Sequence, residues 1–313
     1  MRDYYRQVSY GNLDIVTANL PSSIGWVTAP QSYSYYVNGQ NGFGAYPQNA
    51  QKLVEDAVNA VAGVVDFSKY DNDYDGYADA LFIAHAGPGA EFTGVNNDIW
   101  SHSWSTFSPL LHNGVYVYRY AMVPEYWQTP GDMTCGVYCH ELGHSLFGLP
   151  DLYDVSYNSE GLGNWSLMAS GSWNGPSDLG GSPAFPDAWS RYQMGFTSVN
   201  VIDSNVMAQH ISNAESSPAV YRLWTNGSIG PEYFLVENRE QVGYDSYLPG
   251  SGLCIYHVDE SQTGNWNVWY PGHTTYGNYL VALEQADGNY DLERYVNRGD
   301  QGIYIPAPQV TMI

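Results

Sequence analysis

The stretch HELGHSLFGLPDLYD, residues 140–154, contains two histidines four residues apart with a glutamate directly after the first. On a helix, residues at this spacing lie on one face, so His140 and His144 can offer two imidazole nitrogens to one zinc ion. Glu141 can then reach a water at that metal without being a ligand, and can accept its proton. The stretch predicts a catalytic zinc site. The competing interpretation is a helix whose histidines are hydrogen-bonded core residues.

The residues around this stretch predict a helix over residues 130–147. Thr129 is a good N-cap, Pro130 suits the first helical position, and Asp132 stands where a capping-box acid would. Gly148 is a natural C-terminal stop. The predicted helix therefore presents both histidines and ends just after them.

A catalytic zinc site needs a third protein ligand and one open position. Gly148 allows a sharp turn, and Asp151 follows three residues later. This order resembles the metzincin layout, and GLPD is similar to the stretch in small secreted zinc proteases that use Asp as the third ligand. Three residues rather than two separate His144 from Gly148, which rotates the helix end by about 100°. We expect Asp151 as the third ligand, with Asp154 as the first alternative and a ligand from elsewhere as the second.

A methionine in a tight turn beneath the metal is the other metzincin hallmark. Met168, in NWSLMASGSW at residues 164–173, stands where such a turn would come. The alternative is that Met168 only fills the core.

Sequence blocks along nearly the whole chain resemble, in the same order, the catalytic region of the immune inhibitor A family of secreted prokaryotic zinc metallopeptidases. They include VSYGNLDI, DNDYDGYADALFIAHAGPGAE, IWSHSW, YAMVPE, HELGHSLFGLPDLYD, GNWSLMASGSWNG, PDAWSRYQMG, EYFLVENRE and GYDSYLPGSGLCIYHVDES. The resemblance implies a zinc endopeptidase made as a precursor with a signal and a propeptide, and then exported. It also implies that this chain begins near the mature catalytic domain, with its own cleaved propeptide as a candidate partner.

The stretch DNDYDGYAD, residues 71–79, is typical of the first part of an EF-hand-type calcium loop, with Gly76 for the turn. Phe82 stands at position 12 in place of the usual Glu, so this is not an EF-hand. Without a cation the clustered aspartates would repel each other. We predict a structural Ca²⁺ site here; the alternative is a solvated acidic turn. The expected ligands are four side chains and one backbone carbonyl: Asp71, Asp73, Asp75, Asp79 and Tyr77 (carbonyl).

Composition narrows the classes of partner. The 313 residues include 10 Lys and Arg against 32 Asp and Glu, a formal net charge of −22. This charge argues against nucleic acid or an anionic membrane. No apolar run approaches the ~20 residues that span a bilayer. The first residues, MRDYYRQVSYGNL, have no apolar signal core, so any secretion signal is already gone or was never there. The odd count of three cysteines, Cys135, Cys139 and Cys254, argues against a disulfide framework. Cys135 and Cys139 could be near neighbours on the predicted helix, but we expect two buried free thiols.

The pattern along the chain predicts an α+β fold of the zincin type, with a mixed sheet, a backing helix and an active-site helix. We expect a catalytic domain at residues 1–197 and a β-rich C-terminal subdomain at 198–313 packed on it. Apolar spacing predicts the backing helix at 47–65, and a shorter helix is expected at 186–195. Expected strands lie at 13–20, 25–29, 78–87, 115–123, 221–225, 232–238, 252–259 and 278–285.

Other polar residues are weaker candidates. Glu91 and Asp98 could bind a second cation, and Asp287, Asp291 and Asp300 a further calcium ion. Tyr153 and Tyr157 could donate to an oxyanion. Three histidines could line the cleft, although a structural, hydrogen-bonded role is the plainer interpretation: His85, His102 and His257.

These elements predict hydrolysis of protein or peptide substrates. The substrate peptide would add to an edge strand, taken as residues 115–123. Zinc at His140, His144 and Asp151 would activate water, and Glu141 would transfer its proton to the leaving amine. Two alternatives are a zinc hydrolase acting on a non-protein cell-wall polymer and a non-catalytic adhesion module with structural zinc.

Overall fold

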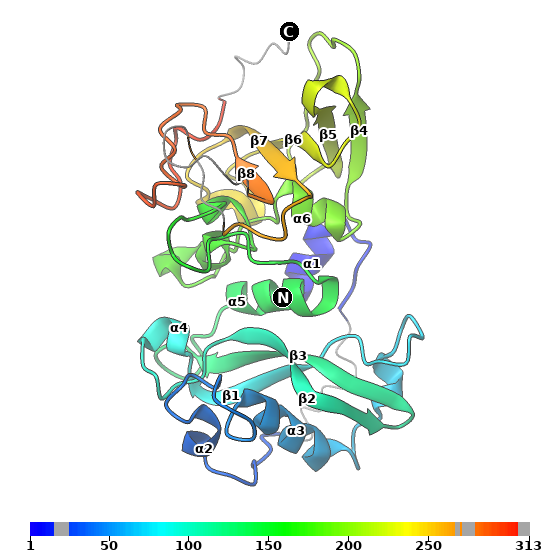
Figure 1. The fold of residues 1–313 in the computed structure, drawn as a ribbon, viewed down its shortest axis with the longest axis vertical. Helices are drawn as coiled ribbons and strands as arrows, with labels where there is room; N and C mark the ends of the chain where they lie inside the picture. The colour runs from blue at the N-terminus through cyan, green and yellow to red at the C-terminus, as the bar shows by residue number, and fades with distance from the viewer. Residues whose placement is uncertain (16–24, 267–269, 271–278, 306–313) are drawn as a thin grey trace. The chain divides into compact units, whose positions relative to one another are not determined.

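The computed structural model describes residues 1–15, 25–266, 270 and 279–305 (Figure 1). The chain forms two compact units: Val16–Gly148, and Met1–Ile15 together with Leu149–Ile313. This division falls directly after the HELGH helix and differs from the expected boundary at residue 197. The expected division into 1–197 and 198–313 stays a prediction. Within the described residues, no helix has the length and apolar character needed to cross a membrane.

The unit Val16–Gly148 contains a three-stranded mixed sheet in the order β1-β3-β2. Strand β1 (Phe82–Pro88) runs parallel to the central strand β3 (Val115–Tyr126), and β2 (His102–His112) runs antiparallel to it. The expected strands at 78–87 and 115–123 are confirmed. The expectation that 115–123 is an edge strand is wrong, because β3 is paired on both sides.

A two-residue hairpin explains why β3 is not an edge. Asn113 and Gly114 both have positive φ, 55° and 88°, and connect the paired residues His112 and Val115. Asn-Gly is the preferred sequence for a type I′ turn, whose twist matches that of the flanking strands. The turn folds β2 back onto β3, and β1 takes the other side.

Helix α3 (Ala50–Val61) covers one face of this sheet. Asn49 caps it, since its Oδ1 accepts the N–H of Lys52 at 3.1 Å. Val54 and Val58 are buried in one apolar cluster with residues of β3 that include Val117, Tyr120 and Met122. The predicted amphipathic helix is confirmed, with shorter ends than 47–65. Figure 1 shows α3 and α2 (Tyr33–Val37) on one side of the sheet and α5 (Gly136–Phe147) on the other. The short helix α4 is Ala90–Thr93.

Helix α5 (Gly136–Phe147) carries the HELGH sequence and starts six residues later than predicted. The Asp132 carboxylate accepts the backbone N–H groups of residues 127, 128 and 129 at 2.7 to 2.9 Å. Gly131 has φ +98°, outside the helical region. Asp132 therefore closes a loop and does not form a capping box with Thr129. Gly148 ends the helix as predicted, with φ 67° and ψ 21°.

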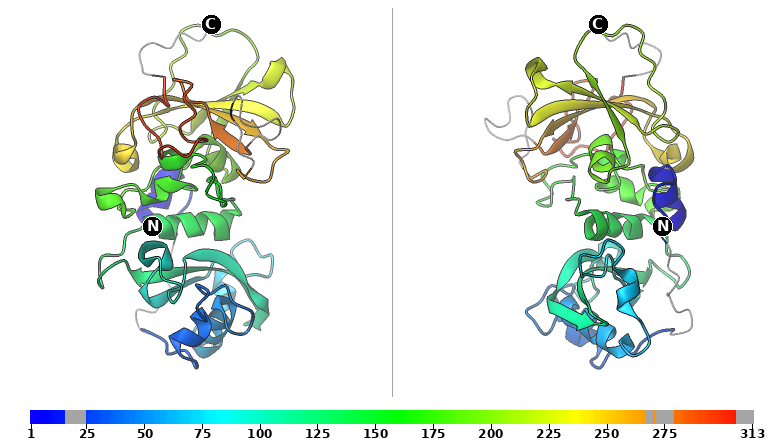
Figure 2. Two further views of the ribbon diagram at one scale, coloured as in Figure 1. Left: turned by 60° about the vertical axis from the view of Figure 1, so that its left-hand side comes forward. Right: turned by 90° about the vertical axis from the view of Figure 1, so that its right-hand side faces the viewer.

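The other unit contains a five-stranded mixed sheet in the order β4-β5-β6-β7-β8. The strands are β4 (Ser198–Ile202), β5 (Ala219–Trp224), β6 (Glu232–Arg239), β7 (Gly252–Asp259) and β8 (Val281–Leu283). The four strands expected after residue 198 are confirmed as β5 to β8, and β4, parallel to β5, was not expected. Figure 2 shows this sheet from two further sides.

Two helices complete this unit. Helix α6 (Ala188–Gln193) is the helix expected at 186–195 and contacts β6 and β7. Helix α1 (Arg2–Val8) buries Tyr4, Tyr5 and Val8 completely, and the Tyr4 hydroxyl donates to the Ala184 carbonyl at 2.6 Å. The 3-10 helices of the described residues are η1 (Phe67–Tyr70), η2 (Gly163–Trp165), η3 (Ser170–Trp173), η4 (Pro176–Asp178), η5 (Thr225–Gly227) and η6 (Gly243–Tyr247).

Two strands expected near the N-terminus have a different outcome. Residues 16–20 of the strand expected at 13–20 lie outside the described residues. The strand expected at 25–29 is wrong, since these residues form no strand and Trp26 is 63% exposed. A β-branched composition gives a strand only where another strand and a face to pack on are present.

Candidate metal centre

Helix α5 presents both predicted zinc ligands on one face. Nε2 of His140 lies 3.0 Å from Nε2 of His144, with the rings at 90° to each other. Two imidazole nitrogens on one tetrahedral zinc ion lie about 3.3 Å apart, so this pair fits a shared ion. Glu141 lies between them in sequence and is buried. The helix thus has the local geometry that the spacing predicts.

Asp151 offers the third ligand atom. One donor atom from each of His140, His144 and Asp151 lies within 4.8 Å of the other two. The alternative, Asp154, is 1% exposed and turns one carboxylate oxygen into its own loop, where it accepts the Ser156 N–H at 2.8 Å. Two imidazoles and one carboxylate match the donor set of catalytic zinc sites. The geometry favours Asp151, and its role as a ligand stays a prediction.

Met168 lies in a tight turn, as predicted. The Ala169 N–H donates to the Ser166 carbonyl at 3.1 Å, and the Met168 N–H donates to Ser166 Oγ at 3.0 Å. Ser166 Oγ in turn donates to Asp187 at 2.7 Å, and Asp187 caps α6. The Met168 side chain is fully buried. The side chain of Asp187, at the start of a distant helix, therefore holds this turn in place.

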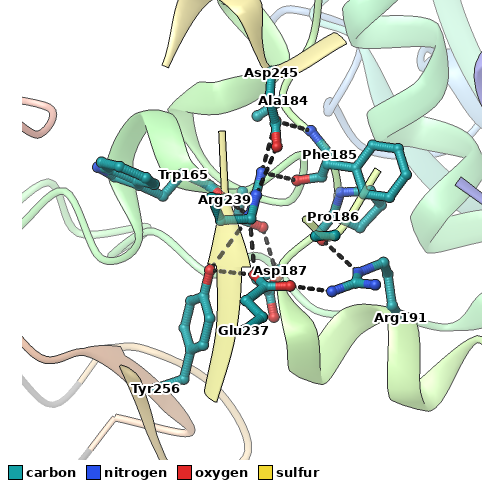
Figure 3. A network of polar contacts seen from close by, with 12 residues as sticks. Trp165, Ala184, Phe185, Pro186, Asp187, Arg191, Glu237, Arg239, Asp245 and Tyr256 are labelled. Carbon is teal, nitrogen blue, oxygen red and sulfur yellow. Dashed lines mark hydrogen bonds and ion pairs between the residues drawn. The ribbon is translucent and has the colours of Figure 1, made fainter. Parts of the chain in front are cut away.

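A buried polar network anchors the segment before Met168 to strand β6 (Figure 3). The Arg239 guanidinium donates to both carboxylate oxygens of Asp245 at 2.7 Å, and to the carbonyls of Trp165 and Phe185 at 3.0 Å. Burial opposes the charge, but Asp245 and Glu237 hold the pKa of Arg239 well above its usual value. Breaking a buried pair from one side typically costs about 3–5 kcal/mol. Arg239 therefore fastens Trp165 firmly to the sheet.

The rest of this network reaches the N-terminal segment. Glu237 accepts from Arg191 and, at 2.7 Å, from the Tyr256 hydroxyl. A second nitrogen of Arg191 donates to the Tyr10 hydroxyl at 2.5 Å, and that hydroxyl donates to the Ala214 carbonyl at 2.6 Å. These bonds tie residues 1–15 to the rest of their unit, which continues from Leu149.

The acidic loop at 71–79 gathers three of its four predicted carboxylate ligands. One oxygen from each of Asp71, Asp73 and Asp79 lies within 4.8 Å of the others. Asp75 is outside this group among the described residues, and its Oδ1 accepts the Tyr77 N–H at 2.8 Å. The loop has the donor atoms that Ca²⁺ prefers.

Backbone pairing holds this loop against β3. The Tyr116 N–H donates to the Gly76 carbonyl at 2.8 Å, and the Ala78 N–H donates to the Tyr116 carbonyl at 2.9 Å. Gly76 has φ +87°, as the predicted turn requires. The carbonyl of Tyr77 is outside this ladder, which is consistent with its expected role as a ligand.

The other acidic candidates differ from one another. Glu91 accepts the N–H and the hydroxyl of Ser101 at 3.0 and 2.5 Å, and Asp98 accepts the Thr93 hydroxyl at 2.7 Å. These contacts indicate that Glu91 and Asp98 brace their loop. One oxygen from each member of the third acidic group lies within 4.8 Å of the others: Asp287, Asp291 and Asp300. Acidic groups are common without an ion, so this grouping alone assigns no site.

Two of the three candidate histidines, His102 and His257, have side-chain partners. His102 Nδ1–H donates to the Trp100 carbonyl at 2.7 Å, and Nε2 accepts from the Tyr120 hydroxyl at 3.1 Å. Burial lowers the pKa of His102, and likewise that of His85, to about 4. His257 Nε2 lies 2.9 Å from Glu232. Cys135, Cys139 and Cys254 form no disulfide within the described residues.

Comparison with known proteins decides the family. Residues 1–198 match the family model for the immune inhibitor A peptidase M6 catalytic domain. The chain belongs to the immune inhibitor A peptidase family. The resemblance found in the sequence is confirmed, and membership places the chain in the metallopeptidase class of hydrolases.

Two known bacterial proteins are similar to this chain. "Immune inhibitor A" of Bacillus thuringiensis subsp. alesti is 33% identical over 210 residues, which cover 56% of this chain and 28% of that relative. "Pre-pro-metalloprotease PrtV" of Vibrio cholerae serotype O1, in two strains, is 31% identical over 257 residues, which cover 72% of this chain and 26% of the relative. The chain therefore spans about a quarter of the length of these relatives.

Sequence reasoning missed the side chains that support the centre. Ser166 and Asp187 are 21 residues apart, and Arg239 lies 74 residues from Trp165. No local motif marks such contacts. The signal for these contacts was a charged residue, Arg239, at the end of the apolar pattern of β6. A buried Arg needs polar partners, so its presence there predicts a polar network.

Proposed function

We propose that this chain is a zinc-dependent endopeptidase that hydrolyses peptide bonds in extracellular proteins. The observation that carries the proposal is the grouping of ligand atoms from His140, His144 and Asp151, with Glu141 next to the first ligand. A bound zinc ion would supply Lewis-acid activation of water and of the scissile carbonyl. Three protein ligands leave the open position that catalysis requires and that a purely structural site does not need.

Glu141 is the proposed general base. Its carboxylate would accept a proton from the attacking water and return it to the leaving amine. The side chain is only 5% exposed, which favours proton transfer to substrate over exchange with bulk solvent. This use of Glu141 distinguishes the peptidase from an adhesion module with structural zinc, because such a module has no need of a general base.

The unit Val16–Gly148 supports a zincin architecture. Helix α3 backs one face of its sheet, and α5, the proposed active-site helix, contacts β2 and β3. Since β3 is the central strand, the substrate peptide would add to β2, whose outer side has no strand partner among the described residues.

Helix α3 narrows the part of β2 that a peptide could use. Gln51 Nε2 donates to the Ser105 carbonyl at 2.8 Å, and the Phe107 N–H donates to Glu55 at 3.0 Å. These two backbone groups are already bonded. We therefore assign the substrate backbone to the start of β2, His102–Trp104.

The proposed cellular location of this chain rests on analogy with a relative. One relative is named a pre-pro-metalloprotease, and we extend a precursor with signal and propeptide to this chain, whose mature form would act outside the cell. Extracellular calcium would then occupy the loop at 71–79 and hold it against β3. The cleaved propeptide remains a candidate partner.

The test compares Glu141→Gln with Glu240→Gln, a matched change at an exposed carboxylate. We expect Glu141→Gln to keep stoichiometric zinc, measured by atomic absorption, and to hydrolyse an unfolded casein-type protein about 10²–10⁴-fold more slowly. Glu240→Gln should match the wild type. Near wild-type hydrolysis by Glu141→Gln would contradict the mechanism. Cleavage of a cell-wall polymer but of no protein would favour the alternative hydrolase.

A further inference from the structure

Asn265 is completely buried and joins the segment after Asp151 to strand β8. Its Nδ2 donates to the Leu152 carbonyl at 2.9 Å and to the Val281 carbonyl at 2.8 Å, while its Oδ1 accepts the Val281 N–H at 3.1 Å. The amide thus uses both of its donor hydrogens and its acceptor inside the protein. Its position is therefore closely determined.

Leu152 directly follows Asp151, and both of its backbone polar groups are held. The N–H donates to the Met168 carbonyl at 2.8 Å. The carbonyl accepts the Leu162 N–H at 2.9 Å in addition to Asn265. The Leu152 side chain is fully buried. Hydrogen bonds therefore hold both peptide groups that follow the proposed third ligand.

The close approach at Leu152 depends on a glycine. A Cβ atom at Gly161 would lie 1.9 Å from the Leu152 carbonyl oxygen, and Gly161 has φ +55°. Only a residue without a side chain allows the chain to pass here. The packing leaves the Leu152 carbonyl accessible to Asn265, which comes from a part of the chain 113 residues away.

We propose that Asn265 is a positioning residue for the third metal ligand, Asp151. The inference rests on the proposed zinc site. By holding the Leu152 carbonyl against β8, Asn265 sets the backbone direction from which the Asp151 carboxylate projects. Groups that orient a metal ligand without touching the metal typically contribute 10–100-fold to metal affinity. Asn265 lies beyond residues 1–198, so the β-rich part of the chain would contribute to the metal centre through the Leu152 backbone.

The test measures zinc affinity by competition with a chromophoric chelator, using the full chain. We expect Asn265→Ala and Asn265→Asp to raise the zinc Kd about 10–100-fold. Asn265→Ser keeps one hydroxyl donor and should raise the zinc Kd by a smaller factor. This variant provides the test if the other two do not fold. Circular dichroism and melting of the zinc-free proteins establish that each variant is folded.

The matched control is Asn49→Ala. Asn49 is also a buried asparagine with a structural hydrogen bond, but it caps α3. We expect it to lower the melting temperature with an unchanged zinc Kd. A folded Asn265 variant with a zinc Kd within twofold of the wild type would overturn the inference, as would an equal loss in Asn49→Ala. If Asp151→Asn also left zinc binding unchanged, the proposed zinc site itself would fail.

Discussion

The backbone N–H of Leu152 donates to the carbonyl oxygen of Met168 at 2.8 Å. This one bond joins the two features that the sequence suggested separately, the third-ligand segment and the methionine turn. Both segments belong to the unit that contains the five-stranded sheet. The turn at Met168 therefore acts on the Asp151 segment through the backbone, in addition to any role of its side chain.

Substitution of the two candidate aspartates should separate them. Asp151→Asn replaces a carboxylate ligand with a neutral amide, so we expect its zinc Kd to rise by more than the roughly 100-fold that loss of an outer partner costs. Asp154→Asn keeps the oxygen that accepts the Ser156 N–H and should bind zinc as the wild type does. Chelator competition measures both. The opposite result would make Asp154 the ligand.

Calcium should stabilise the chain through the loop at 71–79. A ligand at 100 times its Kd stabilises the folded state by about 2.7 kcal/mol. We expect melting at a higher temperature in calcium than in resin-treated buffer with zinc restored, and a smaller calcium response for Asp71→Asn combined with Asp79→Asn. Asp66→Asn, a nearby aspartate that caps η1, is the control and should respond fully. An unchanged response in the double variant would exclude this loop as a calcium site.

Acid should destabilise the unit Val16–Gly148 through His102. Burial lowers the pKa of His102 from 6.5 to about 4, so its contribution to stability is fully present above pH 6.5 and is lost as the pH falls through 4. Between pH 7 and 4.5 we expect the wild type to lose about 2 kcal/mol more unfolding free energy than His102→Gln. Urea titrations of zinc-free protein measure this, because His140 and His144 then bind no metal. The exposed His210→Gln should behave like the wild type, and equal pH slopes for His102→Gln and wild type would contradict the prediction.

Local patterns were reliable where a short segment decides its own conformation. Helix α3, α6 and strands β5 to β8 follow apolar spacing and turn residues. The Asn113-Gly114 pair also marks a hairpin, and it was the available signal for β2 and for the central position of β3. Strand β2 was not predicted, because Ser and Pro interrupt the apolar alternation of residues 102–112.

The start of α5 shows where a local pattern misled. Thr129, Pro130 and Asp132 fit the first turn of a helix, yet Asp132 accepts three backbone N–H groups from residues 127–129. Both arrangements satisfy the carboxylate. The structure has the loop and not the helical turn at residues 127–132, since Gly131 has a positive φ that lies outside the helical region.

The sequence by itself determined the pair His140 and His144 with Glu141 beside it, because a four-residue spacing on a helix places side chains on one face whatever surrounds them. Only the tertiary structure decided how the Asp151 segment is held. Its neighbour Leu152 is bonded to Met168 and to Asn265, 16 and 113 residues away. Such bonds depend on how distant segments pack, and no local spacing encodes them.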